Sequence, residues 1–173
     1  MDSISKLQEA IAFAARAHQG QLRKDDKTPY VSHVFRVAMI VRDLFGFDDP
    51  RMLAAAVLHD TIEDTTKDFD DVEECFGREV AEWVSMLTKN KSLPEAAREE
   101  EYVRRLLAAP WQVQACKLAD VYDNLSDMDS LPAERRSHSL KRLAKYITAI
   151  RGVAGPELEE PLRLVELLQR TKS

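Results

Sequence analysis

The sequence predicts a single all-α domain, a helical bundle of about eight or nine helices. Apolar residues recur with the period of an amphipathic helix along almost the whole chain. No segment alternates apolar and polar residues as a half-buried strand would. Prolines and capping residues then divide the chain into pieces of helical length. A chain of 173 residues suits one domain, so we expect one unit over 1–173, with 133–173 as C-terminal helices packed on the core.

The first three helices are marked by their ends. The first is expected to reach about His18, and a polar loop follows it. The second should end at Gly46, because glycine readily takes the backbone conformation that closes a helix. The third should begin at Pro50, with Asp48 or Asp49 as its N-terminal cap.

The later helices are also bounded by capping residues, glycine and proline. Asp68 is expected to cap a short helix that Gly77 stops, and a further helix and a polar connection follow. A charged helix should then cover about 95–107. Pro110 and Pro132 should each open a long helix, because proline is favoured at helix starts. A last amphipathic helix is expected near the C-terminus.

The stretch 54–65 combines a core element with a cluster of polar groups. Its first part is apolar on every side, which is typical of a helix in the centre of a domain. It then ends in His59, Asp60, Glu63 and Asp64, all within six positions. Burying an unpaired charge costs several kcal/mol, so such a cluster needs compensation, and a divalent cation is the simplest kind. The stretch therefore predicts half of a metal site.

Candidates for the other half lie far away in the sequence. His33 is expected just inside the second helix, and Asp120 on the long helix after Pro110, with Asn124 one turn later on the same face. Imidazole and carboxylate groups suit a borderline divalent ion. Each residue alone also fits a structural role, as a surface histidine, a solvated carboxylate or a helix cap.

Composition limits the classes of function. The net charge of −5 argues against a dedicated nucleic-acid binder, although local cations and a metal would still allow a small polyanionic substrate. No Gly-rich phosphate loop, bilayer-spanning run or N-terminal secretory signal is visible. The two cysteines are expected to be buried or half-buried and not disulfide-bonded. We therefore expect a cytoplasmic protein without a nucleic-acid or membrane partner, and the sequence predicts no oligomeric state.

Four blocks of the chain carry a specific resemblance. The segments 13–24, 28–33, 58–65 and 117–124 resemble, in the same order, the hydrolase half of RelA/SpoT proteins. They look most like the stand-alone small alarmone hydrolases of the metazoan SpoT homologue type. These are HD-domain metal-dependent phosphohydrolases, so the resemblance implies a single HD-domain helical bundle.

The resemblance also implies a role for each matching residue. One divalent ion, usually Mn²⁺ in this family, would be held by His33, His59, Asp60 and Asp120. Other transition metals suit the same ligands. The attacking water would be positioned and activated by Glu63 and Asp64, either of which could be the base. The nucleotide would be contacted by Arg23, Lys24 and Asn124.

The implied reaction removes pyrophosphate from the 3′ position of ppGpp or pppGpp and leaves GDP or GTP. Two alternatives stay open: an HD phosphatase for another phosphorylated nucleotide, such as NADPH or a nucleoside monophosphate, and a non-catalytic nucleotide-binding module. The first gains from one departure: the family's Asp-Arg-Leu-His-Asn run is Asp-Val-Tyr-Asp-Asn at 120–124. A second departure is Val34, which stands where the family often has proline.

Other polar residues near these blocks are expected to be structural. Lys89 and Lys91 are predicted to be surface charges paired with the glutamates at 99–101. His18 is predicted to be hydrogen-bonded behind the site, and Tyr146 to pack in the core.

Overall fold

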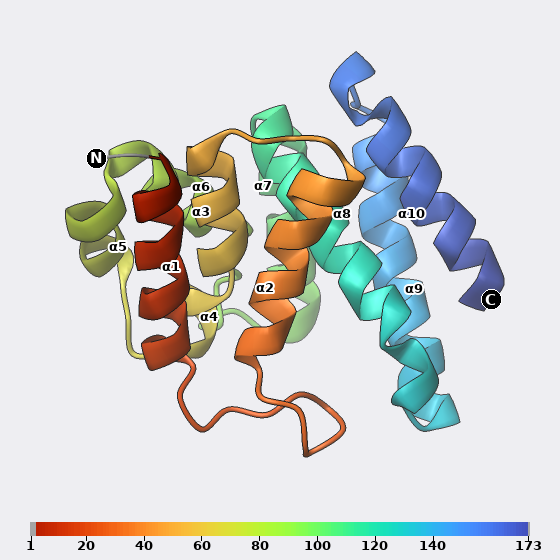
Figure 1. The fold of residues 1–173 in the computed structure, drawn as a ribbon. Helices are drawn as coiled ribbons and strands as arrows, with labels where there is room; N and C mark the ends of the chain where they lie inside the picture. The colour runs from red at the N-terminus through yellow and green to blue at the C-terminus, as the bar shows by residue number, and fades with distance from the viewer. Residues whose placement is uncertain (1–2, 173) are drawn as a thin grey trace.

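The computed structural model describes residues 3–172, and their side chains from Ser5 onward. Met1 and Asp2 belong to the N-terminal stretch in which no secretory signal was expected, and they lie outside the described residues. The described backbone consists of helices α1 to α10 with short connections and contains no strand, only an isolated bridge between Leu22 and Pro29 (Figure 1). The prediction of an all-α fold is confirmed. None of the described helices has the length and apolar character needed to span a bilayer.

Helices α1 (Ser3–Ala17), α2 (Val31–Met39) and α3 (Pro50–Leu58) form one half of the bundle (Figure 1). Gly46 has a φ of 79° and follows α2, which continues as one π-helical stretch at Ile40–Leu44. Asp49 caps α3 by accepting a hydrogen bond from the Arg51 backbone nitrogen. The two predicted boundaries are therefore confirmed, whereas the π-helical stretch was not expected.

Helix α3 lies in the core, as its apolar sequence predicts. Its residues from Met52 to Leu58 are all buried. It packs against α1, α2, α6 and α8, so from Met52 onward no face of the helix is left for solvent. Full burial of one leucine-sized side chain contributes about 1.5–3 kcal/mol. This packing fixes the end of α3, where His59 follows directly.

The next elements are α4 (Thr61–Asp64), α5 (Phe69–Phe76) and α6 (Arg78–Leu87). Asp68 forms a reciprocal capping box with Asp71 at the start of α5. Gly77, with a φ of 86°, separates α5 from α6. Both predicted signals are confirmed, and the single turn α4 places the polar cluster beside the end of α3.

The C-terminal half contains α7 (Glu95–Ala108), α8 (Trp111–Ser126), α9 (Ala133–Arg151) and α10 (Glu159–Lys172), the last preceded by a 3-10 turn at Pro156–Leu158. Pro110 and Pro132 precede α8 and α9 as predicted. Helix α9 contacts α7, α8 and α10, and α10 also contacts α8. Both cysteines are free; Cys116 is buried, but Cys75 is exposed on the outer face of α5, so the prediction for Cys75 is wrong.

Candidate metal and nucleotide site

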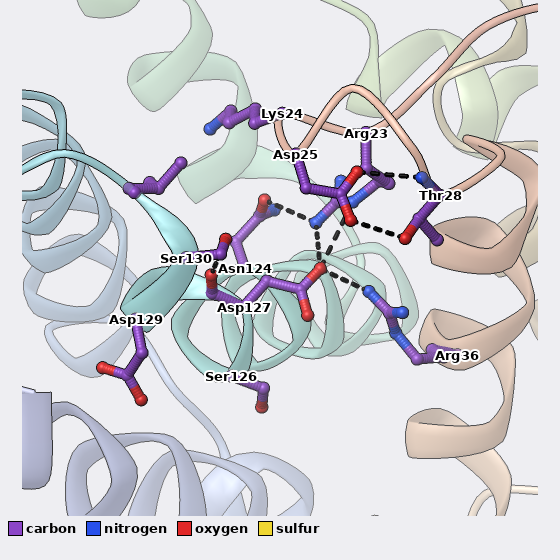
Figure 2. A pocket seen from close by; sticks show the side chains of 11 residues that line it. Arg23, Lys24, Asp25, Thr28, Arg36, Asn124, Ser126, Asp127, Asp129 and Ser130 are labelled. Atoms are coloured by element: carbon purple, nitrogen blue, oxygen red, sulfur yellow. Dashed lines mark hydrogen bonds and ion pairs between the residues drawn. The ribbon is translucent and has the colours of Figure 1, made fainter.

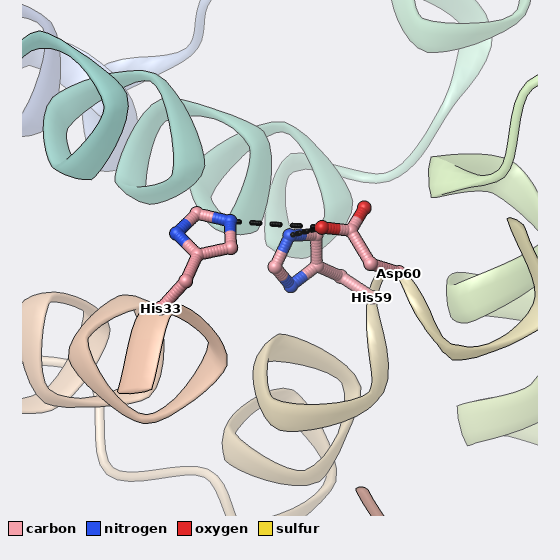
Figure 3. A group of neighbouring side chains, drawn as sticks. All are labelled: His33, His59 and Asp60. Atoms are coloured by element: carbon pink, nitrogen blue, oxygen red, sulfur yellow. Dashed lines mark ion pairs between the residues drawn. The ribbon is translucent and has the colours of Figure 1, made fainter. Parts of the chain in front are cut away.

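Three elements bring the predicted metal ligands together. His33 lies in the first turn of α2, His59 and Asp60 follow α3, and Asp120 lies in the middle of α8. Ligand atoms of His33, His59 and Asp60 all lie within 4.8 Å of one another (Figure 3). Oδ1 of Asp120 is 3.3 Å from Nε2 of His33 and 3.8 Å from Nε2 of His59. The four side chains, far apart in the sequence, therefore converge at one point.

The two imidazole rings are turned so that each presents Nε2 to this point. Nδ1 of His59 lies 2.8 Å from the carbonyl oxygen of Ala56, and Nδ1 of His33 lies 2.6 Å from Oδ2 of Asp123. Both partners accept hydrogen bonds, so each Nδ1 is the donor, and in the neutral ring each Nε2 keeps a lone pair. Nε2 of His59 is buried and has no hydrogen-bond partner in the described part of the chain.

This geometry fits a cation. Nε2 of His59 is 2.9 Å from Oδ2 of Asp60, so in the neutral ring a lone pair faces a carboxylate oxygen. Two acceptors at that distance repel each other unless a positive charge lies between or beside them. Two nitrogen and two oxygen donors form a ligand set that borderline divalent metals accept.

The electrostatics of the site show the same demand for positive charge. Burial lowers the pKa of His33, but hydrogen bonds to Asp120, Asp123 and Asp60 outweigh it and raise the pKa to about 10. Burial alone would raise the pKa of Asp60, yet His59 and His33 hold it well below its usual value. The carboxylates are therefore ionised, and either protons or a metal ion must balance them.

Asp120 is fixed by two neighbours on its own helix. Nζ of Lys117 lies 2.7 Å from its Oδ2, and Nδ2 of Asn124 donates to its Oδ1 at 2.5 Å. Lys117 is buried between the rings of Tyr102 and Tyr146, with Nζ 5.2 and 4.6 Å from their centroids. The role of Lys117 was not predicted, although its position three residues before Asp120 is a signal that could have indicated it.

His33 is fixed by a carboxylate that the sequence showed only as a departure from the family. Asp123 is 2% exposed and also contacts Arg36, whose Nε lies 2.5 Å from Oδ1. Arg36 reaches Asp127 as well, at 2.6 Å. Asp123 and Arg36 each lie three residues after a predicted ligand on the same helix, and this shared spacing was the available signal.

The two acidic residues of α4 have different surroundings. Glu63 is half-buried, and its Oε2 accepts a hydrogen bond from the Lys89 backbone nitrogen at 2.8 Å. Burial raises the pKa of Glu63 and outweighs the opposing effect of this bond. Asp64 is exposed and lies 2.6 Å from Nζ of Lys91. Lys89 pairs with Glu99 as predicted, but it is half-buried and not a surface charge. Lys91 pairs with Asp64 and not with the predicted glutamates.

A cavity of about 280 Å³ contains these groups. Its lining includes all the predicted site residues: Arg23, Lys24, His33, His59, Asp60, Glu63, Asp64, Asp120 and Asn124. Basic and aromatic residues that were not predicted complete it: Tyr30, Lys89, Tyr102, Lys117 and Arg142. The hydroxyl of Tyr30 donates to Asp60. The cavity therefore combines an anionic floor with several cations on its walls.

Arg23 is held more firmly than a free substrate-binding side chain would be. It is 8% exposed, donates to Asp127 at 3.0 Å, and reaches the side-chain oxygen of Asn124 at 3.4 Å (Figure 2). Arg23, Lys24 and Asn124 also line a neighbouring cavity of about 240 Å³. They therefore form the boundary between the two cavities.

His18 and Tyr146, which were also expected to be structural, are placed as predicted. His18 is buried, and its Nδ1 lies 2.9 Å from the side-chain oxygen of Gln21. Tyr146 is buried, and its hydroxyl donates to Glu99. Through Glu99 and Lys89, Tyr146 supports the wall of the larger cavity.

Known proteins resemble this chain along nearly its whole length. The HD domain family matches residues 10–149. The guanosine-3′,5′-bis(diphosphate) 3′-pyrophosphohydrolase MESH1 of Danio rerio is 35% identical, over 98% of this chain and 97% of its own. The human protein of that name is 37% identical, over 92% of each. A solved structure of a metazoan ortholog of SpoT that hydrolyzes ppGpp has a TM-score of 0.84 at 34% identity, covering 98% of this chain and 97% of its own.

Proposed function

Because the chain belongs to the HD domain family, in the group that includes the guanosine-3′,5′-bis(diphosphate) 3′-pyrophosphohydrolases, we propose that it hydrolyses the 3′-pyrophosphate of ppGpp and pppGpp. The products are GDP or GTP and pyrophosphate. The observation that carries the proposal is one cavity that joins four converging imidazole and carboxylate side chains, the half-buried acid Glu63 and the cation Lys24.

The metal is one divalent ion, Mn²⁺ in this proposal, held by His33, His59, Asp60 and Asp120. The Nε2 atoms of both imidazole rings are turned toward the point where the four side chains converge, which supports this ligand set. The buried Nε2 of His59, which has no hydrogen-bond partner among the described residues, supports it as well. When bound, such an ion supplies Lewis acidity for the phosphoryl group and acidifies water. The same ligands accept iron or zinc, so the ligand types do not select one metal. The choice of Mn²⁺ rests on the family resemblance.

Glu63 is the proposed general base. It lines the cavity, and burial raises its pKa toward the range in which a carboxylate accepts a proton effectively. The hydrogen bond from the Lys89 backbone fixes one carboxylate oxygen and leaves the other for water. Asp64, which forms an ion pair with Lys91 and lines the same cavity, would orient the water or the substrate.

The substrate-binding part of the proposal assigns Lys24 to a phosphate group. Arg23 and Asn124 would contact the nucleotide at the boundary of the two cavities, where Arg23 donates to Asn124 and Asn124 donates to Asp120. In the reaction, the water oxygen forms a bond to the phosphorus next to the 3′ oxygen. The bond from that phosphorus to the 3′ oxygen breaks, and the 3′ oxygen gains a proton.

The test is turnover by the Mn²⁺-loaded protein. Incubation with ppGpp should give GDP and pyrophosphate in equal amounts, quantified by anion-exchange chromatography and a pyrophosphate assay. Glu63→Gln prepared in the same way is the control for a contaminating phosphatase. Absence of both products with the metal-loaded wild type would reject the proposal.

An HD phosphatase for another nucleotide is the second candidate. Asp123 favours it, because this carboxylate stands where the family run has histidine and contacts Nδ1 of His33. A panel of ppGpp, NADPH and nucleoside monophosphates separates the two by relative kcat/KM. The third hypothesis, a non-catalytic binding module, would be supported only if the protein binds nucleotide tightly and Glu63→Gln changes no measured property.

We also propose a cytoplasmic location, which suits a nucleotide substrate. Helices α9 and α10 belong to the same domain in this proposal, and their packing on α8 supports it.

A further inference from the structure

The turn that carries the two proposed catalytic acids depends on other parts of the chain for its shape. Helix α4 consists of the four residues Thr61–Asp64, and a helix of one turn is unstable in isolation. Within the described chain, Asp60 precedes it without a capping hydrogen bond from its side chain. The backbone leaves the helix at once, since Thr65 is extended. The orientation of Glu63 and Asp64 therefore has to come from contacts with other segments.

Two side chains supply hydrogen bonds that the end of α4 needs, because the last carbonyl groups of a helix have no partner within it. The Glu63 carbonyl oxygen accepts a hydrogen bond from Nζ of Lys91 at 2.6 Å. The Asp64 carbonyl oxygen accepts one from Nε2 of Gln21 at 2.7 Å. Gln21 lies in the connection between α1 and α2, and Lys91 in the connection between α6 and α7. These two side chains, called here the α4 clamp, join both connections to the same turn.

Lys91 makes the stronger contacts of the α4 clamp. Its Nζ also lies 2.6 Å from Oδ1 of Asp64, so one ammonium group bonds the backbone of Glu63 and the side chain of Asp64. Hydrogen bonds that involve an ionised group are stronger than those between neutral groups, such as the bond from Gln21. Lys91 therefore fixes the relative placement of the two acids.

The connection that carries Lys91 is itself held in place. Arg105 on α7 donates to the Thr88 carbonyl oxygen at 2.6 Å, where the connection begins. The side-chain oxygen of Asn90 accepts a hydrogen bond from the Ser92 backbone nitrogen at 3.0 Å, which forms a tight turn around Lys91. Lys91 is therefore presented to α4 from a fixed backbone.

The position of Lys91 suits support of the acids and not contact with a substrate. Glu63, Asp64 and Lys89 line the metal cavity, but Lys91 is not among the described residues that line it. The side chain of Lys91 is 52% exposed, so its removal leaves water to replace the lost bonds and creates no buried unpaired group. A variant at this position should therefore fold.

We propose that Lys91 is a positioning residue for hydrolysis, which holds α4 so that Glu63 and Asp64 face the metal cavity. This inference rests on the proposed function, in which Glu63 accepts a proton from water and Asp64 orients the water or the substrate. A displacement of about 1 Å at a reacting group can cost about 10²-fold in rate. Lys91 acts on the reaction only through the two acids.

The kinetic test uses the Mn²⁺-loaded protein and ppGpp. Lys91→Met should lower kcat about 10- to 100-fold and leave KM unchanged within about twofold, because the acids lose their orientation while the cations of the cavity remain. The metal content should stay at the wild-type level, since the contacts of Lys91 lead to Glu63 and Asp64. Lys91→Arg can donate to both oxygens and should recover most of kcat.

Lys67→Met is the matched control, because Lys67 also pairs with an aspartate, Asp71, at 2.9 Å and lies outside the lining of the cavity. It should behave as wild type. A rise in KM at unchanged kcat in Lys91→Met would make Lys91 a substrate-binding residue and overturn the inference. A lower melting temperature at unchanged kcat would make its role purely structural and would also overturn it.

Amide hydrogen exchange tests the α4 clamp without turnover. On the Mn²⁺-loaded protein without nucleotide, peptides that cover 61–65 should exchange about tenfold faster in Lys91→Met than in wild type, because α4 opens more easily. Peptides from α8 should exchange equally in both. If ppGpp is not hydrolysed but this difference is seen, the α4 clamp stands and the proposed function fails. Equal exchange of 61–65 in both proteins rejects the clamp even if turnover is normal.

Discussion

Asp123 holds Nδ1 of His33 at 2.6 Å and thereby fixes which nitrogen of that ring faces the cavity. Asp123 is itself held by Arg36, with Nε 2.5 Å from Oδ1. A carboxylate in this position keeps the proton on Nδ1 and leaves Nε2 free as a ligand, which raises the basicity of the ring. The pair lies entirely behind the site, on α2 and α8, and touches neither His59 nor the acids of α4.

Asp123→Ala should therefore weaken metal binding by about 10- to 100-fold, because His33 loses its orienting partner. Competition with a chromogenic chelator measures the affinity. Asp43→Ala, which breaks an exposed ion pair with Arg42, is the control and should bind metal normally. Wild-type affinity in Asp123→Ala would show that His33 is oriented by packing alone.

Removal of a proposed ligand and removal of the proposed base should have different effects. Asp120→Ala should lower the metal content of the purified protein. Glu63→Gln should keep the metal and lose about 10²- to 10⁴-fold in kcat, the usual contribution of a general base. Elemental analysis and initial rates on both variants distinguish the roles.

Glu82→Gln, an exposed acid paired with Arg78, is the control for the glutamate change. The division of roles would be wrong if Glu63→Gln lost the metal, or if Asp120→Ala kept both the metal and the rate.

The pH dependence follows from the burial of Glu63. Because burial raises its pKa, Glu63 is protonated and inactive as a base at the acidic end of the profile. The rate should rise with pH through a pKa above 4.5, the ordinary value for glutamic acid, and then level off. In Glu63→Gln the residual rate should lack this rise. A residual rate with the same acidic limb would assign the base to another group.

Removal of the metal should affect stability as well as activity. Without a cation, lone pairs and carboxylates of the buried site face each other, so chelation should abolish turnover and lower the melting temperature. At a free metal concentration of 100 times Kd, the metal should add about 2.7 kcal/mol to the free energy of unfolding. Thermal melts with and without EDTA, repeated on Asp120→Ala, test this, since that variant should show a much smaller difference.

Much of the fold follows from local signals in the sequence. The apolar run of α3 has no face suited to water, so its burial was predictable. Asp49, Asp68 and Gly77 mark helix ends through local hydrogen bonds or backbone conformation. The convergence of His33 with His59 needed the family resemblance as well, because sequence spacing alone does not say which distant helices meet.

The supporting contacts were harder to predict, because they depend on how helices pack. Lys91 reaches Asp64 only because the connection between α6 and α7 passes over α4. Arg36 and Asp123 meet across the interface of α2 and α8, and each alone resembles an ordinary surface charge.

Anomalous diffraction from crystals of the Mn²⁺-loaded protein tests the metal centre most directly. The account predicts one strong peak in the cavity, bonded to Nε2 of His33, Nε2 of His59 and a carboxylate oxygen each of Asp60 and Asp120, and no such peak in Asp120→Ala. A peak elsewhere, or full metal loading with these four side chains uncoordinated, would contradict it.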